Sequence, residues 1–485
     1  MRFNRTYVPL LALVVAAACG DDTSDGGGGG SSPTTSTTGP TTSGPTTTST
    51  TSGPTTTSTT ASTTATTSTD VGGGGSSTTS GGGEGGAGGA TTTVTSTQMA
   101  SSSTGMLNDQ DGDGWTVADG DCCDVTGTPA CTEPEKVNPG AFEYIGNGVD
   151  DDCDPTTSDL VPQADCSPAA LMTPTTSLAL AKAMDLCQFT SENPPLPQKK
   201  WGVVATDLTL ADGTSTPANV QVGVLGNYGS NVTPRKGSTM ASLSSGTARD
   251  EGDAGYVHPE NGVQTGQLGN FNGMTEVSVP AEYLAAHGGT VPNPPACPAC
   301  NNAVCTHAFD SSRFRMRIRV PTNAQSFSYA LKFYTAEYPE YDCQQYNDFF
   351  LTLLDSSWVP DPMANPPQDP LPLDKNIAID ALGNSVSVNN AFLDVCFPDF
   401  GAPPGSCPGG TLELIGTGMG GWNGTLTDGG GTGWLVNEAP VVPGETIELE
   451  FIIWDAGDHN VDSLVLLDKF RWQIDPAEVG LHDDP

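Results

Sequence analysis

The chain has 485 residues, and its 56 acidic residues against 17 basic ones give a net charge of −39 at pH 7. Because nucleic-acid phosphates are bound by clustered Lys and Arg, this balance argues against nucleic acid as a partner. Divalent cations suit such an acidic chain better, and its thirteen cysteines indicate an oxidising compartment, provided that the chain is exported.

The start of the chain predicts export. Arg2 and Arg5 form a short basic segment, and an apolar run follows over residues 7–18. This run is too short to cross a bilayer, so we interpret residues 1–19 as a signal peptide. Small residues directly precede Cys19, as in the lipobox of bacterial lipoproteins, although Ala16 stands where that pattern usually has Leu. We therefore expect a lipid on Cys19 that anchors the chain at the outer membrane or cell surface; the alternative is ordinary cleavage after an Ala-x-Ala site.

Residues 20–105 are predicted to be a disordered linker. Ser, Thr and Gly dominate this segment, which has almost no charge and no apolar periodicity. Nothing in it can offset the entropy lost on ordering. A flexible coil of this length spans on the order of 50 Å, enough to hold a domain clear of a membrane. A glycosylated stalk is the alternative that the composition allows.

An aspartate-rich module is predicted over residues 106–159, which contain fourteen acidic side chains and one Lys. Its first three candidate ligands have the spacing of positions 1, 3 and 5 in an EF-hand loop: Asp109, Asp111 and Asp113. The carbonyl of Trp115 follows as the next oxygen, but Gly120 occupies the place of the closing Glu, so the loop is not an EF-hand. The closing ligand is expected from one of three aspartates: Asp119, Asp121 and Asp124.

A second acidic set with the same two-residue step ends the module. Its members are Asn147, Asp150, Asp152 and Asp154. Calcium fits both sets best because the ligands are numerous and all oxygen; the alternative is a solvated acidic loop without an ion. Adjacent cysteines rarely bond to each other, so we expect one of Cys122 and Cys123 to pair with Cys131 and the other with Cys153.

Residues 160–485 are predicted to form a mainly β body. Apolar residues at helical spacing predict one short helix over residues 178–187. Beyond residue 199, short β-like runs alternate with Gly, Pro, Asn and Asp turns. The strands are expected at 313–320, 326–337, 347–354, 376–380, 385–389, 446–454 and 463–472. Many short strands with one or two short helices indicate an antiparallel β-sandwich of jelly-roll type.

The clearest strand alternates strictly between apolar and basic residues over 313–320. Its apolar residues face one way and four arginines face the other: Arg313, Arg315, Arg317 and Arg319. In one interpretation these arginines form a binding face for an acidic polysaccharide. In the favoured interpretation they pair across the sheet with Glu448 and Glu450 of the strand at 446–454.

Four aspartates surround the last two predicted strands: Asp455, Asp458, Asp462 and Asp468. They are candidates for a second calcium site. They are equally good candidates for turn caps, in which the side chain accepts a backbone hydrogen bond.

The remaining cysteines are predicted to form disulfides. Cys297 and Cys300 form a Cys-x-x-Cys pair that Cys305 and His307 follow. The surrounding Pro and Asn residues disfavour a redox helix, and the spacing matches zinc sites poorly. Two disulfides are expected to join this group to the downstream cysteines Cys343, Cys396 and Cys407. Cys166 and Cys187 complete the candidates.

Motifs for catalysis are lacking. None of the five His belongs to a recognisable nucleophile arrangement, and neither Gly-x-Ser-x-Gly nor His-Glu-x-x-His occurs. Glu337 and Glu340, with Asp342 nearby, imitate the carboxylate pair of a glycoside hydrolase, but close carboxylates beside a turn are more often surface groups or metal ligands. The sequence therefore predicts a protein that is not an enzyme.

Several motifs of the body resemble the choice-of-anchor L domain. They are Leu178-Ala-Leu-Ala-Lys-Ala-Met, Trp201-Gly-Val-Val, Gly229-Ser-Asn-Val-Thr-Pro-Arg-Lys-Gly, Leu243-Ser-Ser-Gly-Thr-Ala, Glu337-Tyr-Pro-Glu, Tyr346-Asn-Asp-Phe-Phe and Asp462-Ser-Leu-Val-Leu-Leu-Asp-Lys-Phe. The resemblance implies a secreted or surface-displayed bacterial domain, carried on varied anchors, without an established enzymatic activity.

Residues 109–154 separately resemble the aspartate-rich metal-binding motif of bacterial surface proteins, which is similar to thrombospondin type 3 calcium repeats. Ile145 stands near the place where those motifs often have a Cys. The overall expectation is a lipid-anchored, calcium-binding surface protein whose β-sandwich, at residues 160–485, binds glycans or neighbouring surface proteins. A structural coat component without a soluble ligand is the main alternative.

Overall fold

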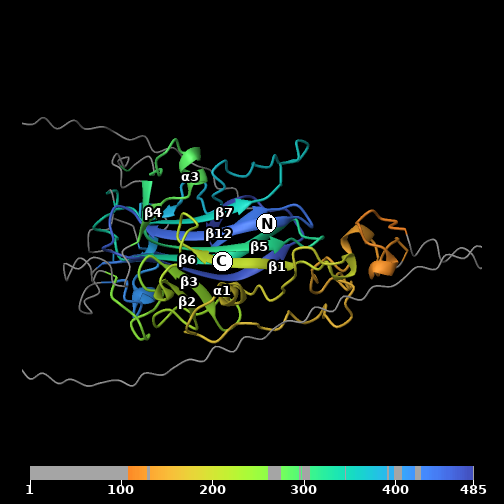
Figure 1. Ribbon diagram of the computed structural model, residues 1–485, viewed down its shortest axis with the longest axis horizontal. Coiled ribbons are helices and arrows are strands. Elements are labelled where there is room, and N and C mark those ends of the chain that lie inside the picture. The colour runs from red at the N-terminus through yellow and green to blue at the C-terminus, as the bar shows by residue number, and fades with distance from the viewer. Residues whose placement is uncertain are drawn as a thin grey trace, which may run out of the picture. The chain divides into compact units, whose positions relative to one another are not determined.

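The computed structural model describes residues 108–127, 131–259, 275–293, 297, 306–344, 346–389, 393–397, 407–420 and 428–483 (Figure 1). Residues 93–485 form one compact unit. The predictions for residues 1–19, with Cys19, and for residues 20–105 lie outside the described residues, as do Cys300 and Cys305.

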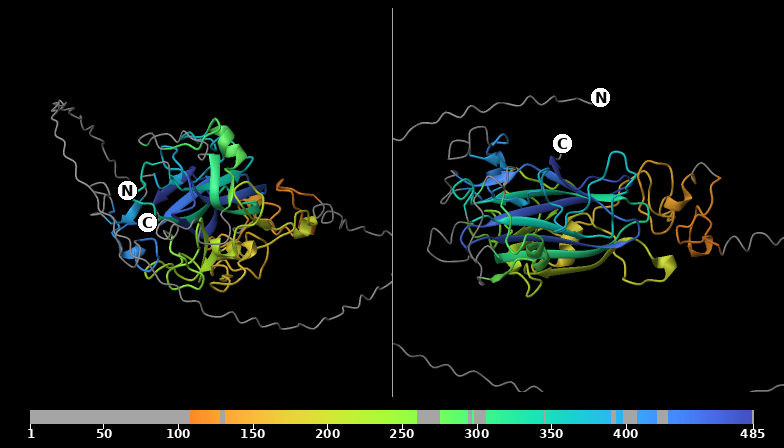
Figure 2. Two further views of the ribbon diagram at one scale, coloured as in Figure 1. Left: turned by 60° about the vertical axis from the view of Figure 1, so that its left-hand side comes forward. Right: turned by 90° about the horizontal axis from the view of Figure 1, so that it is seen from above.

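Two antiparallel sheets pack face to face, which confirms the predicted β-sandwich (Figures 1 and 2). The first sheet has the order β1 (Gly202–Thr209), β5 (His307–Arg319), β12 (Thr446–Asp455), β7 (Phe349–Asp355) and β8 (Val386–Ser387), with β4 (Glu276–Ser278) paired to β5. The second has the order β14 (Gly480–Asp483), β11 (Leu435–Pro440), β6 (Ser326–Thr335), β13 (Ser463–Gln473), β3 (Met240–Ser244) and β2 (Val222–Leu225). In this second sheet β10 (Gly430–Thr432) pairs with both β6 and β9 (Leu393–Cys396).

The described α-helices are two, and both are short. α1 (Ser177–Ala183) confirms the helix expected near residue 178; the Thr176 hydroxyl accepts the Ala179 N–H at its start, and Leu180 is buried against the sandwich. α3 (Ala281–Ala286) buries Tyr283 against the first sheet. Single 3₁₀ turns lie at Val117–Asp119, Pro134–Lys136, Leu196–Gln198, Asn219–Gln221 and Leu412–Leu414.

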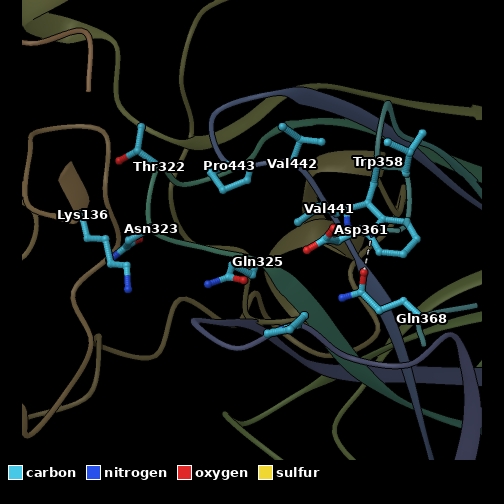
Figure 3. A pocket seen from close by; sticks show the side chains of 12 residues that line it. Lys136, Thr322, Asn323, Gln325, Trp358, Asp361, Gln368, Val441, Val442 and Pro443 are labelled. Carbon is cyan, nitrogen blue, oxygen red and sulfur yellow. Dashed lines mark hydrogen bonds between the residues drawn. The ribbon is translucent and has the colours of Figure 1, made fainter. Parts of the chain in front are cut away.

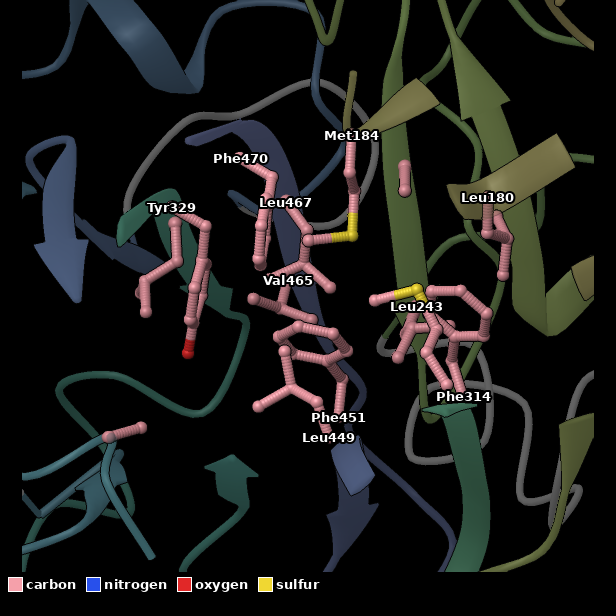
Figure 4. Close-up of a cluster of buried hydrophobic side chains, with 14 of the residues drawn as sticks. Leu180, Met184, Leu243, Phe314, Tyr329, Leu449, Phe451, Val465, Leu467 and Phe470 are labelled. Atoms are coloured by element: carbon pink, nitrogen blue, oxygen red, sulfur yellow. The ribbon is translucent and has the colours of Figure 1, made fainter. Parts of the chain in front are cut away.

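The core between the sheets follows from the period-two pattern of β5. Phe314 lies opposite Phe451 of β12, and the two rings stack with centroids 6.0 Å apart. Side chains of β6 and β13 meet them from the second sheet, and Met184 and Leu180 close one side (Figure 4). Burial of such large apolar side chains contributes about 1.5–3 kcal/mol each and is the main force that holds the sheets together.

The outer faces of both sheets are also covered, which simple alternation did not predict. Tyr334 of β6 packs in a second cluster outside the second sheet, and Trp454 of β12 packs beneath α3 in a third. The strand expected at 376–380 is wrong: only isolated bridges form, at Asn376 and Ile379. The strand expected at 385–389 shortens to β8, because Val388 and Asn389 bond to the residues that precede β7.

Two of the four arginines of β5 pair with glutamates of β12, as the favoured interpretation predicted. Arg313 pairs with Glu450 at 2.5 Å, and Arg315 pairs with Glu448 at 3.5 Å. Two acidic partners were not predicted: Asp207 for Arg315 and Glu192 for Arg317. Arg319 donates instead to three backbone carbonyls, those of Ser191, Glu192 and Lys200.

Five disulfides join described cysteines. Cys122–Cys153 and Cys123–Cys131 staple the aspartate-rich module as expected, and Cys166–Cys187 ties the segment before α1 to its end. Cys297 reaches Cys343 as predicted. Cys396 bonds to Cys407 rather than to the Cys-x-x-Cys group, because β9 and the turn after it bring these two close together.

Candidate metal centre

In the first acidic loop, aspartate side chains accept hydrogen bonds from the backbone of the loop itself. The Asp109 carboxylate accepts the N–H groups of Gly112 and Gly114, at 2.6 and 3.0 Å. Both glycines have positive φ, +85° and +96°, a conformation that other residues adopt only under strain. Asp111 and Asp113 likewise accept the N–H group of the residue two positions later. The side chains of all three aspartates thus turn toward the loop, as a cation-binding loop requires.

Five carboxylates of this loop form two overlapping groups, and the oxygens of each group lie within 4.8 Å of one another. The groups are Asp109, Asp111, Asp113 and Asp111, Asp121, Asp124. Asp121 and Asp124 are buried, and Gln110 holds Asp124 through its N–H at 2.6 Å. One oxygen each of Asp111 and Asp121 is buried without a hydrogen-bond donor, so each has a lone pair available for an ion.

The electrostatics of this loop oppose ionisation in the absence of a cation. Burial, with Asp111 as a charged neighbour, raises the pKa of Asp113 to about 7. Burial and the neighbouring aspartates also raise the pKa of Asp111 and of Asp121. No Lys or Arg within the described part of the module pairs with these groups, because Lys136 bonds to Glu133. An all-oxygen set with uncompensated negative charge fits a hard divalent cation.

The second acidic set assembles differently from its prediction. Asp150 and Asp152 come together with Glu143, which was not predicted, and their oxygens lie within 4.8 Å. Burial and the nearby aspartates raise the pKa of Glu143 to about 7. Glu143 ends the sequence Pro139-Gly-Ala-Phe-Glu, and only the chain fold brings it to residues 150–152. The only sequence signal that could have identified Glu143 as a candidate ligand was its acidic side chain.

Two of the predicted aspartate ligands, Asp119 and Asp154, lie outside these carboxylate groups. Asp119 accepts the hydroxyl of Thr116 at 2.6 Å, Asn147 donates to Asp151, and Asp154 pairs with Lys200 at 3.1 Å. Hydrogen bonds from Thr156 and the contact with Lys200 lower the pKa of Asp154 to about 2. Trp115 is buried, and its N–H donates to Asp113.

The module is bonded directly to the turn between β5 and β6. Asn138 donates to Asp113 at 2.7 Å and accepts the hydroxyl of Thr322 at 2.6 Å. Asn323 donates to the carbonyl of Phe142 and accepts its N–H. A carboxylate of the first acidic loop is therefore only one side chain away from the sandwich.

A hollow of about 360 Å³ opens at this junction (Figure 3). Its lining combines an indole, amides, a carboxylate and an ammonium group, mixed with Val and Pro side chains. The lining residues are Lys136, Thr322, Asn323, Gln325, Trp358, Val359, Asp361, Gln368, Val441, Val442, Pro443 and Pro476. Such a mixture provides an aromatic surface for stacking and polar groups for orientation.

Residues 300–471 match the family model of the Choice-of-anchor L domain. The match confirms the resemblance over this segment and indicates a surface-associated β-sandwich protein. The resembling motifs before residue 300, and the aspartate-rich module, lie outside the choice-of-anchor L segment. No curated protein and no solved structure matches the chain.

The choice-of-anchor L segment contributes most of the hollow, whereas the module adds Lys136. Glu337 and Glu340, the carboxylates considered for hydrolysis, both lie in this segment and differ in accessibility: Glu337 is buried and Glu340 is exposed. Among the described residues, no helix combines the length and apolar character needed to cross a bilayer.

Proposed function

We propose that this protein is a calcium-dependent binding protein of the bacterial cell surface, without catalytic activity. The aspartate-rich module holds calcium, and the hollow at its junction with the sandwich takes a glycan. A lipid on Cys19 anchors the chain at the outer membrane, and residues 20–105 form the tether. The single observation that carries the proposal is the Asn138 bridge, because it joins a cation ligand to the rim of the hollow.

Calcium is the ion that fits the module best. The five clustered carboxylates offer only oxygen ligands, and two of their buried oxygens lack a hydrogen-bond donor. Extracellular modules of this kind bind calcium with Kd of about 10⁻⁴ to 10⁻³ M, which suits an ion that is permanently present outside the cell. With the ion bound, Asp113 is held in place, and Asn138 then fixes Thr322.

The hollow supports a glycan as the ligand. Trp358 provides an aromatic face, and the amides of Gln325 and Gln368 and the carboxylate of Asp361 provide polar contacts. Gln368 accepts the N–H of Asp361 at 2.9 Å, which holds this side of the hollow in shape. Lys136 is paired with Glu133, and Asp361 is also in the lining, so we expect a sugar that is recognised by stacking and hydrogen bonds rather than by its charge.

A glycan array screened in millimolar calcium and again in EDTA tests the proposal. We expect binding in calcium only, and we expect Trp358→Ala to abolish it. Leu373→Ala, which removes a fully exposed apolar side chain from the same β7–β8 connection, is the matched control. Binding that survives EDTA, or that is insensitive to Trp358→Ala, contradicts the proposal.

A pair of variants tests the calcium ligands themselves. Asp121→Asn removes a clustered carboxylate and should weaken calcium binding by about tenfold or more, as loss of a metal-site group commonly does. Asp119→Asn changes an aspartate that accepts the Thr116 hydroxyl and belongs to neither carboxylate group, so it should leave the affinity unchanged. Isothermal titration measures both, and equal effects of the two substitutions would disprove the assigned ligand set.

The anchor and the alternative function have their own tests. Mass spectrometry of the native N-terminus should find a diacylglyceryl group on Cys19, and a free amine with an unmodified thiol refutes the anchor. A structural coat component would show no ligand on the array but would remain in an ordered surface layer. Electron microscopy of cells that lack the protein distinguishes this alternative.

A further inference from the structure

Strand ends of both sheets bring buried carboxylates together at the end of the sandwich away from the aspartate-rich module. The module contacts the β5–β6 turn, whereas Glu337 follows the far end of β6. Asp348 directly precedes β7, and Asp455 is the last residue of β12. We call Glu337, Asp348 and Asp455 the buried acid cluster.

The cluster is shielded from water and lacks compensating groups. Its three side chains belong to residues that are at most 3% exposed. Both oxygens of Asp455 and one oxygen of Glu337 are buried without a hydrogen-bond partner. No Lys or Arg among the described residues pairs with the cluster, and the nearby His459 is engaged with Asp310 at 2.6 Å.

Two serine hydroxyl groups lie near the cluster, and one of them donates to a member of it. The Ser463 hydroxyl donates to Asp348 at 2.6 Å, and the Ala456 N–H donates to the same carboxylate. The Ser245 hydroxyl, near Asp455, donates to the Ser463 carbonyl and accepts the Ser463 N–H. Asp348 is therefore held in position, while Asp455 and Glu337 keep oxygens directed into an acidic, buried space.

The backbone around the cluster makes room for one more acid. Asp462, which directly precedes β13, is also buried, and a Cβ at Gly246 would lie 1.8 Å from its carboxylate. Only glycine fits at residue 246. The fold thus accommodates a fourth carboxylate beside the cluster instead of an apolar side chain.

Protonation of the cluster would neutralise its charge but would leave some of its carboxyl oxygens without hydrogen-bond partners. Burial and mutual repulsion raise the pKa of Asp348 to about 7 and those of Glu337 and Asp455 well above their ordinary range. A protonated Asp455 can donate only one hydrogen bond, to the adjacent Asp348, so its other oxygen and one oxygen of Glu337 still lack a donor. A divalent cation compensates several carboxylates at once and satisfies their free oxygens.

We propose that Glu337, Asp348 and Asp455 form a second cation site inside the sandwich, which takes a hard divalent ion such as Ca²⁺. Their oxygens are spaced more widely than those of the module groups, so the ion would draw the side chains inward. The other two aspartates near these strands have different roles. Asp458 accepts the N–H of Asn460, and Asp468 accepts the N–H of Arg235 at a separate place.

The test uses the full chain with both acidic sets of the module silenced, by Asp111→Asn and Asp121→Asn in the first loop and Asp150→Asn and Asp152→Asn in the second, so that it is independent of the proposed function. In this background we expect calcium still to bind and to raise the Tm measured by calorimetry. Adding Asp455→Asn should abolish both effects, whereas adding Asp212→Asn, which changes an exposed turn-capping aspartate, should preserve them. If Asp455→Asn does not fold, Glu337→Gln replaces it, with near-UV circular dichroism as the check of tertiary structure.

Two results would overturn the proposal. One is the absence of calcium binding and of any Tm shift in the silenced background. The other is a calcium effect that Asp455→Asn and Glu337→Gln leave unchanged in folded protein. Loss of calcium binding on silencing the module alone would identify the module as the only calcium site.

Discussion

Asp468 shows how a single buried carboxylate ties distant segments together. Its oxygens accept the N–H groups of Arg235, Lys236 and Lys469. It also shares a hydrogen bond with Asp185, at the end of the α1 segment. One side chain of β13 thus fixes the loop after β2 and the chain that follows α1.

This arrangement predicts a pH dependence of stability. Burial and the negative charge of Asp185 raise the pKa of Asp468 to about 7, whereas the unfolded value is near 3.8. The folded state therefore binds more protons between these values, and this group's contribution to stability falls as pH rises toward 7. The slope is at most about 1.4 kcal/mol per pH unit.

Urea unfolding of the native protein and Asp468→Asn from pH 5 to pH 8, in constant calcium, measures the effect. Asparagine imitates the protonated acid, so the difference in unfolding free energy should shift in favour of the variant as pH rises. Asp212→Asn, on an exposed turn, should show no such trend. Parallel pH profiles for the native protein and Asp468→Asn would contradict the prediction.

At the scale of elements, the arginine row of β5 contains ion pairs of very different strength. Arg313 and Glu450 are both largely buried, and the Glu450 oxygen that does not contact Arg313 has no hydrogen-bond partner. Arg317 and Glu192 are both well exposed to water. A buried pair is costly to break because the remaining charge is left uncompensated, whereas an exposed pair is screened by solvent.

Arg313→Met should therefore destabilise the fold by about 3–5 kcal/mol, and Arg317→Met by about 1 kcal/mol or less. The double variant Arg313→Met with Glu450→Met should recover most of the loss, since no buried charge remains. Urea denaturation of the three variants gives the free energies of unfolding. A similar cost for both single variants would show that burial does not determine the strength of these pairs.

The strands that could be predicted are those whose pattern depends on local physics. β5 alternates cleanly because its outer face carries charged groups, so its period of two is visible in the residues alone. β13 was expected at residues 463–472, although only packing shows why its residues, such as Leu466, are buried on the outer face too. The 376–380 segment resembles a strand but forms isolated bridges, a result that depends on tertiary neighbours.

The candidate sites also divide into those that a local sequence pattern encodes and those that only the tertiary fold assembles. Asp109, Asp111 and Asp113 were predictable because their spacing in the chain is also their spacing in space. Glu143 was missed because it joins its group from a separate turn, and the buried acid cluster unites residues from three strand ends. No local pattern encodes a meeting of that kind.

At the scale of the whole molecule, the disulfide Cys122–Cys153 links the two acidic groups of the module, which are its first acidic loop and its second acidic set. It closes a separation of 31 residues, and loop-closure entropy assigns such a cross-link roughly 3–4 kcal/mol. Replacing both cysteines by Ser should therefore weaken calcium binding at both groups, because each group must then be ordered separately. Replacing Cys166 and Cys187, whose disulfide lies outside the module, is the control.

Isothermal titration and calorimetry with and without calcium measure this effect. We expect the module variant to have a lower affinity and a smaller calcium-induced rise in Tm, whereas the control variant keeps its calcium affinity. Unchanged calcium binding in the Cys122→Ser, Cys153→Ser double variant would mean that each acidic group is organised by local contacts only.

The arginine row also bears on how neighbouring copies of the protein interact with one another. Four of the nine arginines are occupied within the fold and are not available to contact a neighbouring molecule, while the chain as a whole keeps a net charge of −39. Neighbouring molecules on one cell would consequently repel each other, over a range of about 8 Å at physiological ionic strength. Their lateral density should then increase with added salt or divalent ions and decrease in dilute media.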